Sequence, residues 1–284
     1  MPELPEVETV VRGLKYLAGQ KLSTIEIFDA RVWFESEVKP VSFRNLRLTE
    51  TARRGKYLIF RFEKGLSLVG HLRMTGKFLE QSSPTIAPHV RQVIGQKKGK
   101  GLQVRSRFIF ENHRVLFIDT RRFGTLTAVR SEENYFAKKK IAPDPILDPE
   151  RALDVFLQAM RTKKKPIKAL LLDQSAVAGV GNIYADEALH AVGVHPTRSS
   201  PKVKDPKALW DAILTLLHKS IAAGGSTIND YVNAEGEKGA YAQNLLVYGK
   251  TGEACSTCGK KIQRIQLAGR STHFCLNCQP KKVR

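Results

Sequence analysis

Two Cys-x-x-Cys pairs near the C-terminal end constrain the fold of this chain more than any other feature. Cys255 and Cys258 form the first pair, and Cys275 and Cys278 form the second. Four thiolates at this spacing can close a tetrahedral zinc site, because each pair supplies two ligands. A closed shell of four sulfurs leaves no position for water, so the sequence predicts one structural Zn²⁺. Four unrelated structural cysteines would rarely show this paired spacing.

The segment between the two pairs is predicted to be a β-hairpin held at its base by the metal. Residues with β-propensity lie on both sides of Ala268–Gly269, and Arg270 follows that turn. An arginine near the tip of a hairpin suits a contact with phosphate or with a groove. A solvated arginine is the open alternative, since most arginines are exposed.

The charge balance limits the class of partner. The 284 residues include 47 Lys and Arg against 27 Asp and Glu, which gives a formal net charge of +20. This excess favours a polyanion, either nucleic acid or an anionic membrane surface. No apolar run reaches the roughly 18 residues of a membrane span, and the acidic N-terminus does not fit a signal peptide. Because the cysteines show metal spacing, we expect a reducing, cytoplasmic compartment.

The length predicts more than one domain. A lysine run at Lys138–Lys140 is followed by the proline- and aspartate-rich stretch Ala142–Pro149, which is typical of a linker. We expect an N-terminal domain at 1–135, a linker at 136–150, a helical domain at 151–244 and a zinc finger at 245–284.

The N-terminal domain is predicted to contain one helix and an antiparallel β-sandwich, within a multidomain α+β protein. Apolar residues recur at helical spacing from Val7 to Leu17, between Pro5 and Gly19. Short strands are predicted at Leu22–Phe28, Tyr57–Phe62, Ser67–Leu72, Arg107–Glu111, Val115–Asp119 and Thr125–Val129. Helices of the second domain are predicted at Ala152–Arg161, Ile167–Leu172, Tyr184–Val192 and Lys207–Ala223.

The N-terminus offers covalent chemistry. Removal of Met1 would leave Pro2 as a secondary amine, which can attack an electrophilic carbon and form an iminium. At the positive end of the first helix, the macrodipole favours loss of a proton from this amine. Glu3 beside it can donate a proton. Proline and acidic residues also commonly start helices, so a purely structural role is the alternative.

Several segments match, in order, the blocks of one enzyme family. They are MPELPEVETV at 1–10, RRGKYL at 53–58, HLRMTGK at 71–77, DTRRFGTL at 119–126, KALLLDQ at 168–174, GVGNIYADEAL at 179–189, GGSTINDYV at 224–232 and GRSTHFC at 269–275. By these blocks, which cover nearly the whole chain, the sequence resembles bacterial formamidopyrimidine-DNA glycosylase.

The resemblance implies a monomeric glycosylase and AP lyase of base excision repair that removes oxidised purines (8-oxoguanine, formamidopyrimidines) from damaged double-stranded DNA. Pro2 would attack the sugar C1′ while Glu3 donates a proton, so that the base leaves and a Schiff base remains. Lys56, interpreted as a strand residue, would contact phosphate and donate a proton during β-elimination. Arg270 would grip the flanking phosphates for δ-elimination. No nucleotide cofactor is implied, and DNA binding would place the enzyme at the bacterial nucleoid.

The resemblance also assigns the residues that unstack the duplex. Met74, Arg121 and Phe123 would enter the base stack and fill the gap left by the everted nucleotide. Without the resemblance, Met74 and Phe123 would be interpreted as core residues. The segment Gly224–Tyr241 corresponds to the family's loop that closes over the everted base.

Further DNA contacts are implied in the helical domain and in one atypical block. Asn182 can cap the helix that follows Gly181, and the free N–H groups of that helix can meet a phosphate. The resemblance implies that this part of the chain, 151–244, is the family's helix-two-turn-helix domain. Lys163 matches a DNA-binding lysine of the family. The family's His-x-His-Val block reads Ala87–Pro88–His89–Val90 here, so only His89 is kept as a DNA-contacting or structural residue. We hypothesise that the basic segment 96–107 replaces the missing contact.

Two other functions stay open on the sequence. Endonuclease VIII, in the same family, prefers oxidised pyrimidines, but that branch typically has Gly where this chain has Leu4. A non-catalytic zinc-finger DNA-binding protein would account for the charge and the cysteines. It would not account for Pro2, Glu3 and Lys56 together.

Overall fold

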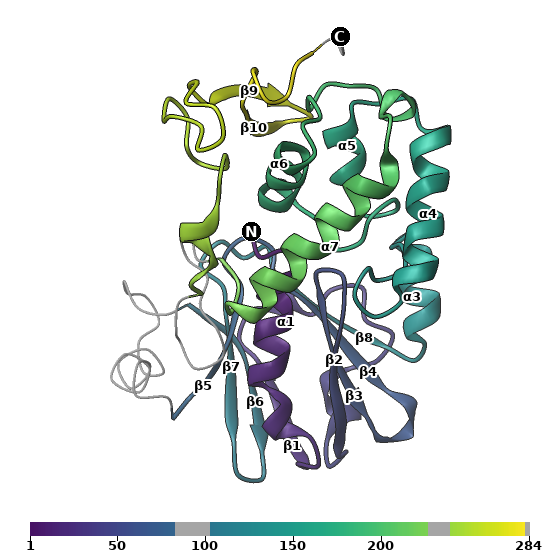
Figure 1. The fold of residues 1–284 in the computed structure, drawn as a ribbon. Coiled ribbons are helices and arrows are strands. Elements are labelled where there is room, and N and C mark those ends of the chain that lie inside the picture. Colours follow the sequence, from purple (N-terminus) through teal and green to yellow (C-terminus); the bar gives the residue numbers. More distant parts are fainter. Residues whose placement is uncertain (83–102, 227–238, 282–284) are drawn as a thin grey trace. The chain divides into compact units, whose positions relative to one another are not determined.

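The computed structural model describes residues 1–82, 103–226 and 239–281 (Figure 1). By contact density the chain divides into two compact units, Met1–Lys139 with Ala223–Ala240 and Lys140–Ala222 with Tyr241–Arg284. His89, most of the basic segment 96–107 and most of Gly224–Tyr241 lie outside the described residues.

The first unit begins with helix α1 (Leu4–Gly13), for which Glu3 is the N-cap residue. The Glu3 N–H donates to the Glu6 carboxylate at 2.8 Å, as in a capping box. The apolar face of α1 is buried and packs on strand β2. The helix ends earlier than predicted, because the periodicity up to Leu17 continues through a tighter 3-10 turn, Lys15–Leu17.

Among the described residues of this unit, the strands form two antiparallel four-stranded sheets. One has the order β1-β6-β7-β5, with β1 (Leu22–Ile27), β6 (Val104–Phe110), β7 (Arg114–Ile118) and β5 (Lys77–Glu80). The other has the order β2-β3-β4-β8, with β2 (Leu48–Arg54), β3 (Tyr57–Phe62), β4 (Ser67–His71) and β8 (Thr125–Val129).

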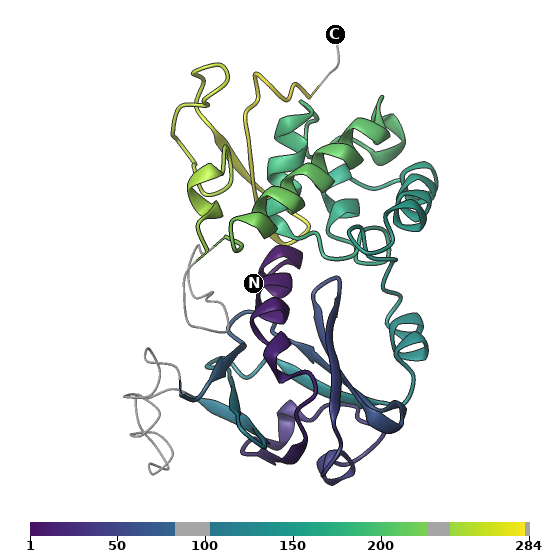
Figure 2. The same ribbon diagram turned by 60° about the horizontal axis from the view of Figure 1, so that its bottom comes forward.

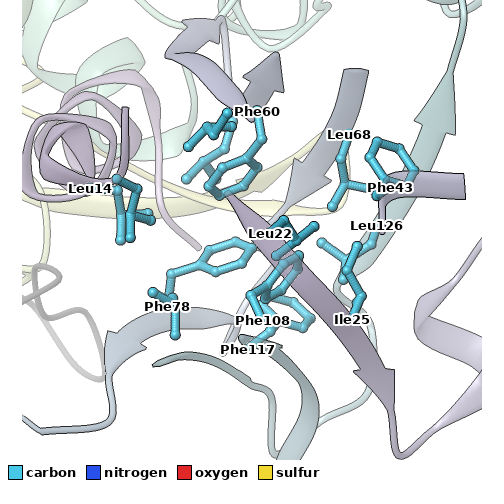
Figure 3. Close-up of a cluster of buried hydrophobic side chains, with 14 of the residues drawn as sticks. Leu14, Leu22, Ile25, Phe43, Phe60, Leu68, Phe78, Phe108, Phe117 and Leu126 are labelled. Atoms are coloured by element: carbon cyan, nitrogen blue, oxygen red, sulfur yellow. The ribbon is translucent and has the colours of Figure 1, made fainter. Parts of the chain in front are cut away.

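A phenylalanine cluster lies between the two sheets (Figure 3). Phe60 of β3 stacks on Phe108 of β6 with ring centroids 6.0 Å apart, and Phe78 contacts Phe117 at 4.9 Å. Ring pairs from both sheets give the sandwich a shared core, since aromatic side chains bury large areas. The predicted sandwich is therefore confirmed. Strand β2 was not predicted, because its sequence LTETARR is largely polar and its place is set by pairing with β3.

The second unit is helical and ends in a hairpin. Its helices are α4 (Pro149–Thr162), α5 (Ile167–Leu171), α6 (Asn182–Ala191) and α7 (Pro206–Ala222), and its strands are β9 (Gln263–Leu267) and β10 (Arg270–Phe274). Helices α6 and α7 lie side by side in both views (Figures 1 and 2). The Tyr184 hydroxyl of α6 meets the Ser220 hydroxyl of α7 at 2.6 Å within this interface.

Short helices complete the described part of the chain. Helix α3 (Glu132–Lys138) belongs to the first unit, and Arg61 and Ser67 of the second sheet hold its Glu132. Further 3-10 turns lie at Ala30–Val32, Pro40–Phe43, Glu63–Gly65, Ser200–Lys202 and Tyr241–Asn244. Within the described ranges, none of the helices has the length and apolar character needed to cross a membrane.

One substitution is expected to stabilise the turn of the β9–β10 hairpin. Its two central residues, Ala268 and Gly269, have φ of 50° and 70°, as in a type I′ turn. Alanine is strained there by about 1 kcal/mol, whereas Asn-Gly is the preferred pair. We expect Ala268→Asn to slow amide exchange in β9 and β10 roughly threefold or more, and Ala268→Val to accelerate it. Equal exchange in both variants would contradict the turn assignment.

Candidate active site and metal centre

Four predicted site residues of the first unit lie in segments at one end of the β2-β3-β4-β8 sheet, namely Lys56, Met74, Arg121 and Phe123. Tyr57 pairs with His71, and His71 pairs with Thr125. The turn 55–56, the loop 72–76 and the loop 119–124 therefore all project from the same end of the sheet, because neighbouring antiparallel strands alternate in direction. We call the last two segments the Met74 loop and the Phe123 loop.

The two residues that follow Met1 are buried at the start of α1. Pro2 is buried and Glu3 is only 2% exposed. The Glu6 carboxylate receives the Glu3 N–H on one oxygen and the Ser226 N–H, at 2.8 Å, on the other. Glu6 thus joins the N-terminus to the beginning of the segment Gly224–Tyr241. No sequence pattern pointed to Glu6, since a contact across 220 residues leaves no local pattern.

Lys56 lies in the turn between β2 and β3, so its placement on a strand was wrong. Gly55, with φ of 56°, allows a two-residue turn in which Arg54 still pairs with Tyr57. The turn is fixed by Arg53, whose guanidinium is 2.9 Å from Glu8 of α1 and 3.2 Å from the Gly55 carbonyl oxygen. Lys56 is 5% exposed, so this arrangement positions a buried ammonium group relative to α1.

His71 is a further polar group at this end of the sheet, and no sequence pattern pointed to it. Burial lowers the pKa of His71 to about 3, and the positive charges of Arg73 and Lys56 act in the same direction. Its Nδ1 accepts the Arg73 N–H at 3.0 Å. The ring is therefore neutral at pH 7 with its proton on Nε2, which makes His71 a hydrogen-bond donor in spite of its cationic surroundings.

The two loops expose apolar side chains. Met74 is 44% exposed and Phe123 is 53% exposed, which excludes the interpretation of either as a core residue. The Arg121 guanidinium carbon lies 5.2 Å from the centroid of the Phe123 ring. A cation stacked on an exposed ring, beside an exposed methionine, forms an apolar and cationic projection suited to insertion between bases.

In the second unit, Arg270 begins β10 and is exposed. Its side chain has no hydrogen bond or ion pair to another residue in the described ranges. The hairpin behind it is held by Lys168, which is fully buried and lies 2.6 Å from Asp186. The Lys168 ammonium also donates to the Ser271 carbonyl at 2.9 Å and to the Thr272 hydroxyl at 2.8 Å. Lys168 and Asp186 therefore fix the strand that presents Arg270.

Asn182 is the first residue of α6, and Gly181 is the N-cap, so the predicted capping role of Asn182 is wrong. Its amide Nδ2 instead donates to the Ser271 carbonyl oxygen at 2.9 Å. Its buried Oδ1 has no hydrogen-bond partner within the described part of the chain. This side-chain contact holds Asn182 beside the hairpin that carries Arg270.

Lys163 follows α4 and is held by an acidic partner. Its ammonium is 3.0 Å from Asp173 and 2.9 Å from the Ser175 hydroxyl, and Lys165 also contacts Asp173 at 3.0 Å. Burial alone would raise the pKa of Asp173, but hydrogen bonds from Ser175, Lys163 and Lys165 outweigh it and hold the pKa well below its usual value. Two lysines on one carboxylate leave this corner with a net positive charge.

The four cysteines meet at the base of the hairpin. The Cys258 and Cys275 sulfurs are 3.4 Å apart, the Cys255 and Cys278 sulfurs are 3.9 Å apart, and all four lie within 4.8 Å of one another. A tetrahedral zinc with Zn–S bonds of about 2.3 Å needs sulfurs about 3.8 Å apart. The donor set therefore fits Zn²⁺. His190, with its Nε2 3.6 Å from the Cys255 sulfur, can donate to that thiolate.

Comparison with known families matches three consecutive parts of the chain. Residues 1–126 match the formamidopyrimidine-DNA glycosylase N-terminal domain, 141–232 the formamidopyrimidine-DNA glycosylase H2TH domain, and 252–281 a zinc finger found in FPG and IleRS. The chain belongs to the formamidopyrimidine-DNA glycosylase family.

Relatives and solved structures agree over the whole length. The formamidopyrimidine-DNA glycosylase of Lactococcus lactis subsp. cremoris is 40% identical over 99% of this chain and 100% of its own. That of Streptococcus pneumoniae is 40% identical over 98% and 99%. The structure of a Lactococcus lactis FPG mutant with Fapy-dG-containing DNA is 37% identical, with a TM-score of 0.86 over 99% of this chain and 100% of that one. The predicted family and fold class are confirmed, and the chain is a DNA glycosylase of base excision repair.

Membership of the glycosylase family also supports the predicted cofactor. A zinc-finger match over the four cysteines, together with sulfur spacing that fits a tetrahedral ion, gives one structural Zn²⁺. Zinc supplies stability to the hairpin and has no open position for chemistry.

Loss of one ligand should release the metal and loosen the glycosylase hairpin. We expect Cys258→Ser to lower bound zinc from about one ion per chain to nearly none, because a structural site needs its full thiolate shell. Elemental analysis of the purified protein, together with amide exchange in β9 and β10, measures both effects. Ser256→Ala, a change between the two ligands of the first pair, is the matched control and should keep the zinc. A Cys258→Ser variant with full zinc would contradict the site.

Burial of His71 should make the first unit acid-sensitive. The folded protein keeps His71 neutral down to a pH of about 3, whereas the ordinary pKa in the unfolded chain is 6.5. The unfolded state binds the extra proton between these values, so stability falls as the pH drops below 6.5, by at most about 1.4 kcal/mol per pH unit.

The variant His71→Asn tests this expectation, because the Asn oxygen can still accept the Arg73 N–H. Urea unfolding between pH 7.5 and pH 5 should show a shallower loss of stability in the variant than in the parent. Parallel pH dependence in the two proteins would show that His71 does not remain neutral in the folded state.

Proposed function

We propose that this protein is a bifunctional DNA glycosylase and AP lyase that excises oxidised purines, 8-oxoguanine and formamidopyrimidines, from damaged double-stranded DNA. The observation that carries the proposal is the buried Pro2–Glu3 pair at the start of α1. Solved relatives include complexes of Lactococcus lactis Fpg with DNA containing Fapy-dG or an abasic site, and these support the same substrate class here. The protein acts as a monomer and needs no nucleotide cofactor.

Pro2 is the nucleophile once Met1 has been removed. Its secondary amine attacks the sugar C1′ and the bond from C1′ to the base breaks, with the amine proton leaving on the departing base. The bond from C1′ to the ring oxygen then breaks, and an iminium between C1′ and Pro2 remains. The positive end of α1 disfavours a protonated amine at this position, so the lone pair is available. Glu3, held at the N-cap of the same helix, donates a proton to the sugar as its ring opens.

Strand cleavage follows by two eliminations. Lys56, positioned by the Gly55 turn and by Arg53, contacts phosphate and serves as proton donor during β-elimination, which breaks the bond from C3′ to its phosphate oxygen. Arg270 grips the flanking phosphates through its fork of donors and supports δ-elimination at C5′. Its exposure on a hairpin fixed by Lys168 is consistent with that role.

Met74, Arg121 and Phe123 unstack the duplex and fill the space of the everted nucleotide, a role that their exposure and stacking support. Asn182 and Lys163 contact the DNA backbone, since Asn182 lies beside the Arg270 hairpin and Lys163 in a corner of net positive charge. We keep His89 as a DNA-contacting or structural residue, on the resemblance alone.

Four Cys residues, at 255, 258, 275 and 278, hold the zinc. The domain organisation that we propose is 1–135 for the catalytic helix and sandwich, 136–150 for the linker, 151–244 for the helical domain and 245–284 for the finger. As a bacterial DNA-repair enzyme, the protein would act in the cytoplasm, associated with the nucleoid through its net positive charge.

Borohydride trapping tests the nucleophile, because reduction of the iminium leaves a stable bond between protein and DNA. The protein without Met1 should be trapped on duplex DNA containing an abasic site or 8-oxoguanine. A variant with an uncleaved N-terminal extension should bind the same DNA with little change in affinity and should give no trapped complex. A pure DNA-binding protein would give none in either form.

The variant Pro2→Gly keeps a free N-terminal amine but lacks the proline ring, so it tests whether the ring nitrogen is required. The primary amine of glycine is more mobile, so we expect trapping and cleavage to fall by about tenfold or more. Trapping and cleavage equal to those of the parent would show that Pro2 is not the nucleophile.

A further inference from the structure

The Met74 loop and the Phe123 loop share one buried carboxylate. Asp119 is 1% exposed and begins the Phe123 loop directly after β7. Its Oδ1 accepts a hydrogen bond from the Thr75 hydroxyl of the Met74 loop and another from the Arg121 N–H at 3.1 Å. Its Oδ2 accepts the Gly124 N–H at 2.7 Å. A single side chain therefore binds both loops at residues that adjoin Met74, Arg121 and Phe123.

Thr75 closes this connection from its own side. Its hydroxyl oxygen accepts the Arg121 N–H at 3.1 Å while its proton goes to Asp119. The close approach of Asp119 to position 124 requires glycine there, since a Cβ would lie 2.6 Å from the Phe117 ring and 3.1 Å from the Asp119 carboxylate. Specific hydrogen bonds therefore fix the position of the Met74 loop relative to the Phe123 loop.

Two further arginines, Arg105 and Arg122, take part in contacts that hold the Phe123 loop. The Arg105 guanidinium of β6, itself nearly buried, donates to the Asp119 carbonyl oxygen at 2.7 Å. The carboxylate of Asp29 lies 3.7 Å from Arg105 and 3.7 Å from Arg122. Both the backbone and the side chain of Asp119 are therefore fixed, and Arg122 is held by Asp29 rather than beside the exposed pair Arg121 and Phe123.

We propose that Asp119 is a positioning residue that joins the Met74 loop and the Phe123 loop into one rigid wedge, so that Met74, Arg121 and Phe123 enter the duplex together. The inference rests on the proposed function, in which these three side chains unstack the DNA. Asp119 touches no substrate. It acts by removing the separate motions of two loops, which would otherwise have to be ordered during insertion.

Asp119→Asn and Thr75→Val test the connection without a large change in volume. An Asn amide offers one acceptor oxygen in place of two, so at least one of the donors from Thr75, Arg121 and Gly124 loses its partner. Asp144→Asn is the matched control. Asp144 is also buried and also accepts two backbone N–H groups, from Ile146 and Leu147, but it lies in the other unit.

Insertion is measured with 2-aminopurine placed beside a stable abasic-site analogue in a duplex, because unstacking raises its fluorescence. We expect the fluorescence rise to be lost in Asp119→Asn, reduced in Thr75→Val and unchanged in Asp144→Asn. The double variant of Asp119 and Thr75 should be no worse than Asp119→Asn alone, since both changes break the same connection. A full fluorescence rise in Asp119→Asn would overturn the inference.

Trapping on single-stranded abasic DNA tests the chemistry separately, because no duplex has to be unstacked. Asp119→Asn should be trapped like the parent on the single strand and about tenfold or more slowly on the duplex. If trapping of Asp119→Asn were reduced equally on single-stranded and duplex DNA, the Thr75→Val variant would provide the test instead. A full 2-aminopurine fluorescence rise with Thr75→Val would then overturn the inference. Failure of the parent to be trapped would refute the proposed function, while the fluorescence series would still test the wedge.

Discussion

Antiparallel pairing within the β2-β3-β4-β8 sheet is the constraint on which the site of the first unit depends. Because strand direction alternates, β2 ends, β3 begins, β4 ends and β8 begins at one end of the sheet. Residues 55–56, 72–76 and 119–124, far apart in the sequence, thereby become neighbours. A shift of register by one residue would turn His71 and its neighbours to the opposite face, so the phenylalanine core that fixes the register also fixes the site.

Buried charged residues fix the positions of the turns and loops that carry the predicted site residues. Arg53, with 1% of its side chain exposed, joins α1 to the Lys56 turn, and Asp119 joins the two exposed loops. In the second unit Lys168 and Asp186 hold the hairpin under Arg270. Removing one partner of the fully buried Lys168–Asp186 pair should cost about 3–5 kcal/mol, because the other charge is left buried and unpaired. These groups are hidden from solvent, yet they determine which cations and apolar side chains are presented to it.

The features predicted best from the sequence are those that depend on residues close together in the chain. The cysteine spacing predicted a four-sulfur cluster, and the flanks of Ala268–Gly269 predicted the hairpin, because both depend on residues close in the chain. Lys56 was misplaced on a strand because a two-residue turn inside a β-rich stretch has too few residues to change the pattern. Without the family resemblance, Met74 and Phe123 would have been placed in a core, since apolar side chains predict a core unless the loop that carries them is known.

Two residues at this end of the sheet adopt a strained backbone conformation, which tertiary contacts impose against the local backbone preference. Arg73 and Arg122 have φ of 52° and 61°, a left-handed conformation that residues with a Cβ rarely adopt, and each adjoins an exposed apolar side chain, Met74 or Phe123. Such strain, of order 1 kcal/mol per residue, persists only where surrounding contacts determine the backbone. The N–H of Arg73 is held by His71, and Arg122 lies between the Arg121 and Gly124 N–H groups that Asp119 accepts. The same contacts that impose the strain therefore keep Met74, Arg121 and Phe123 at the surface instead of letting them collapse into the core.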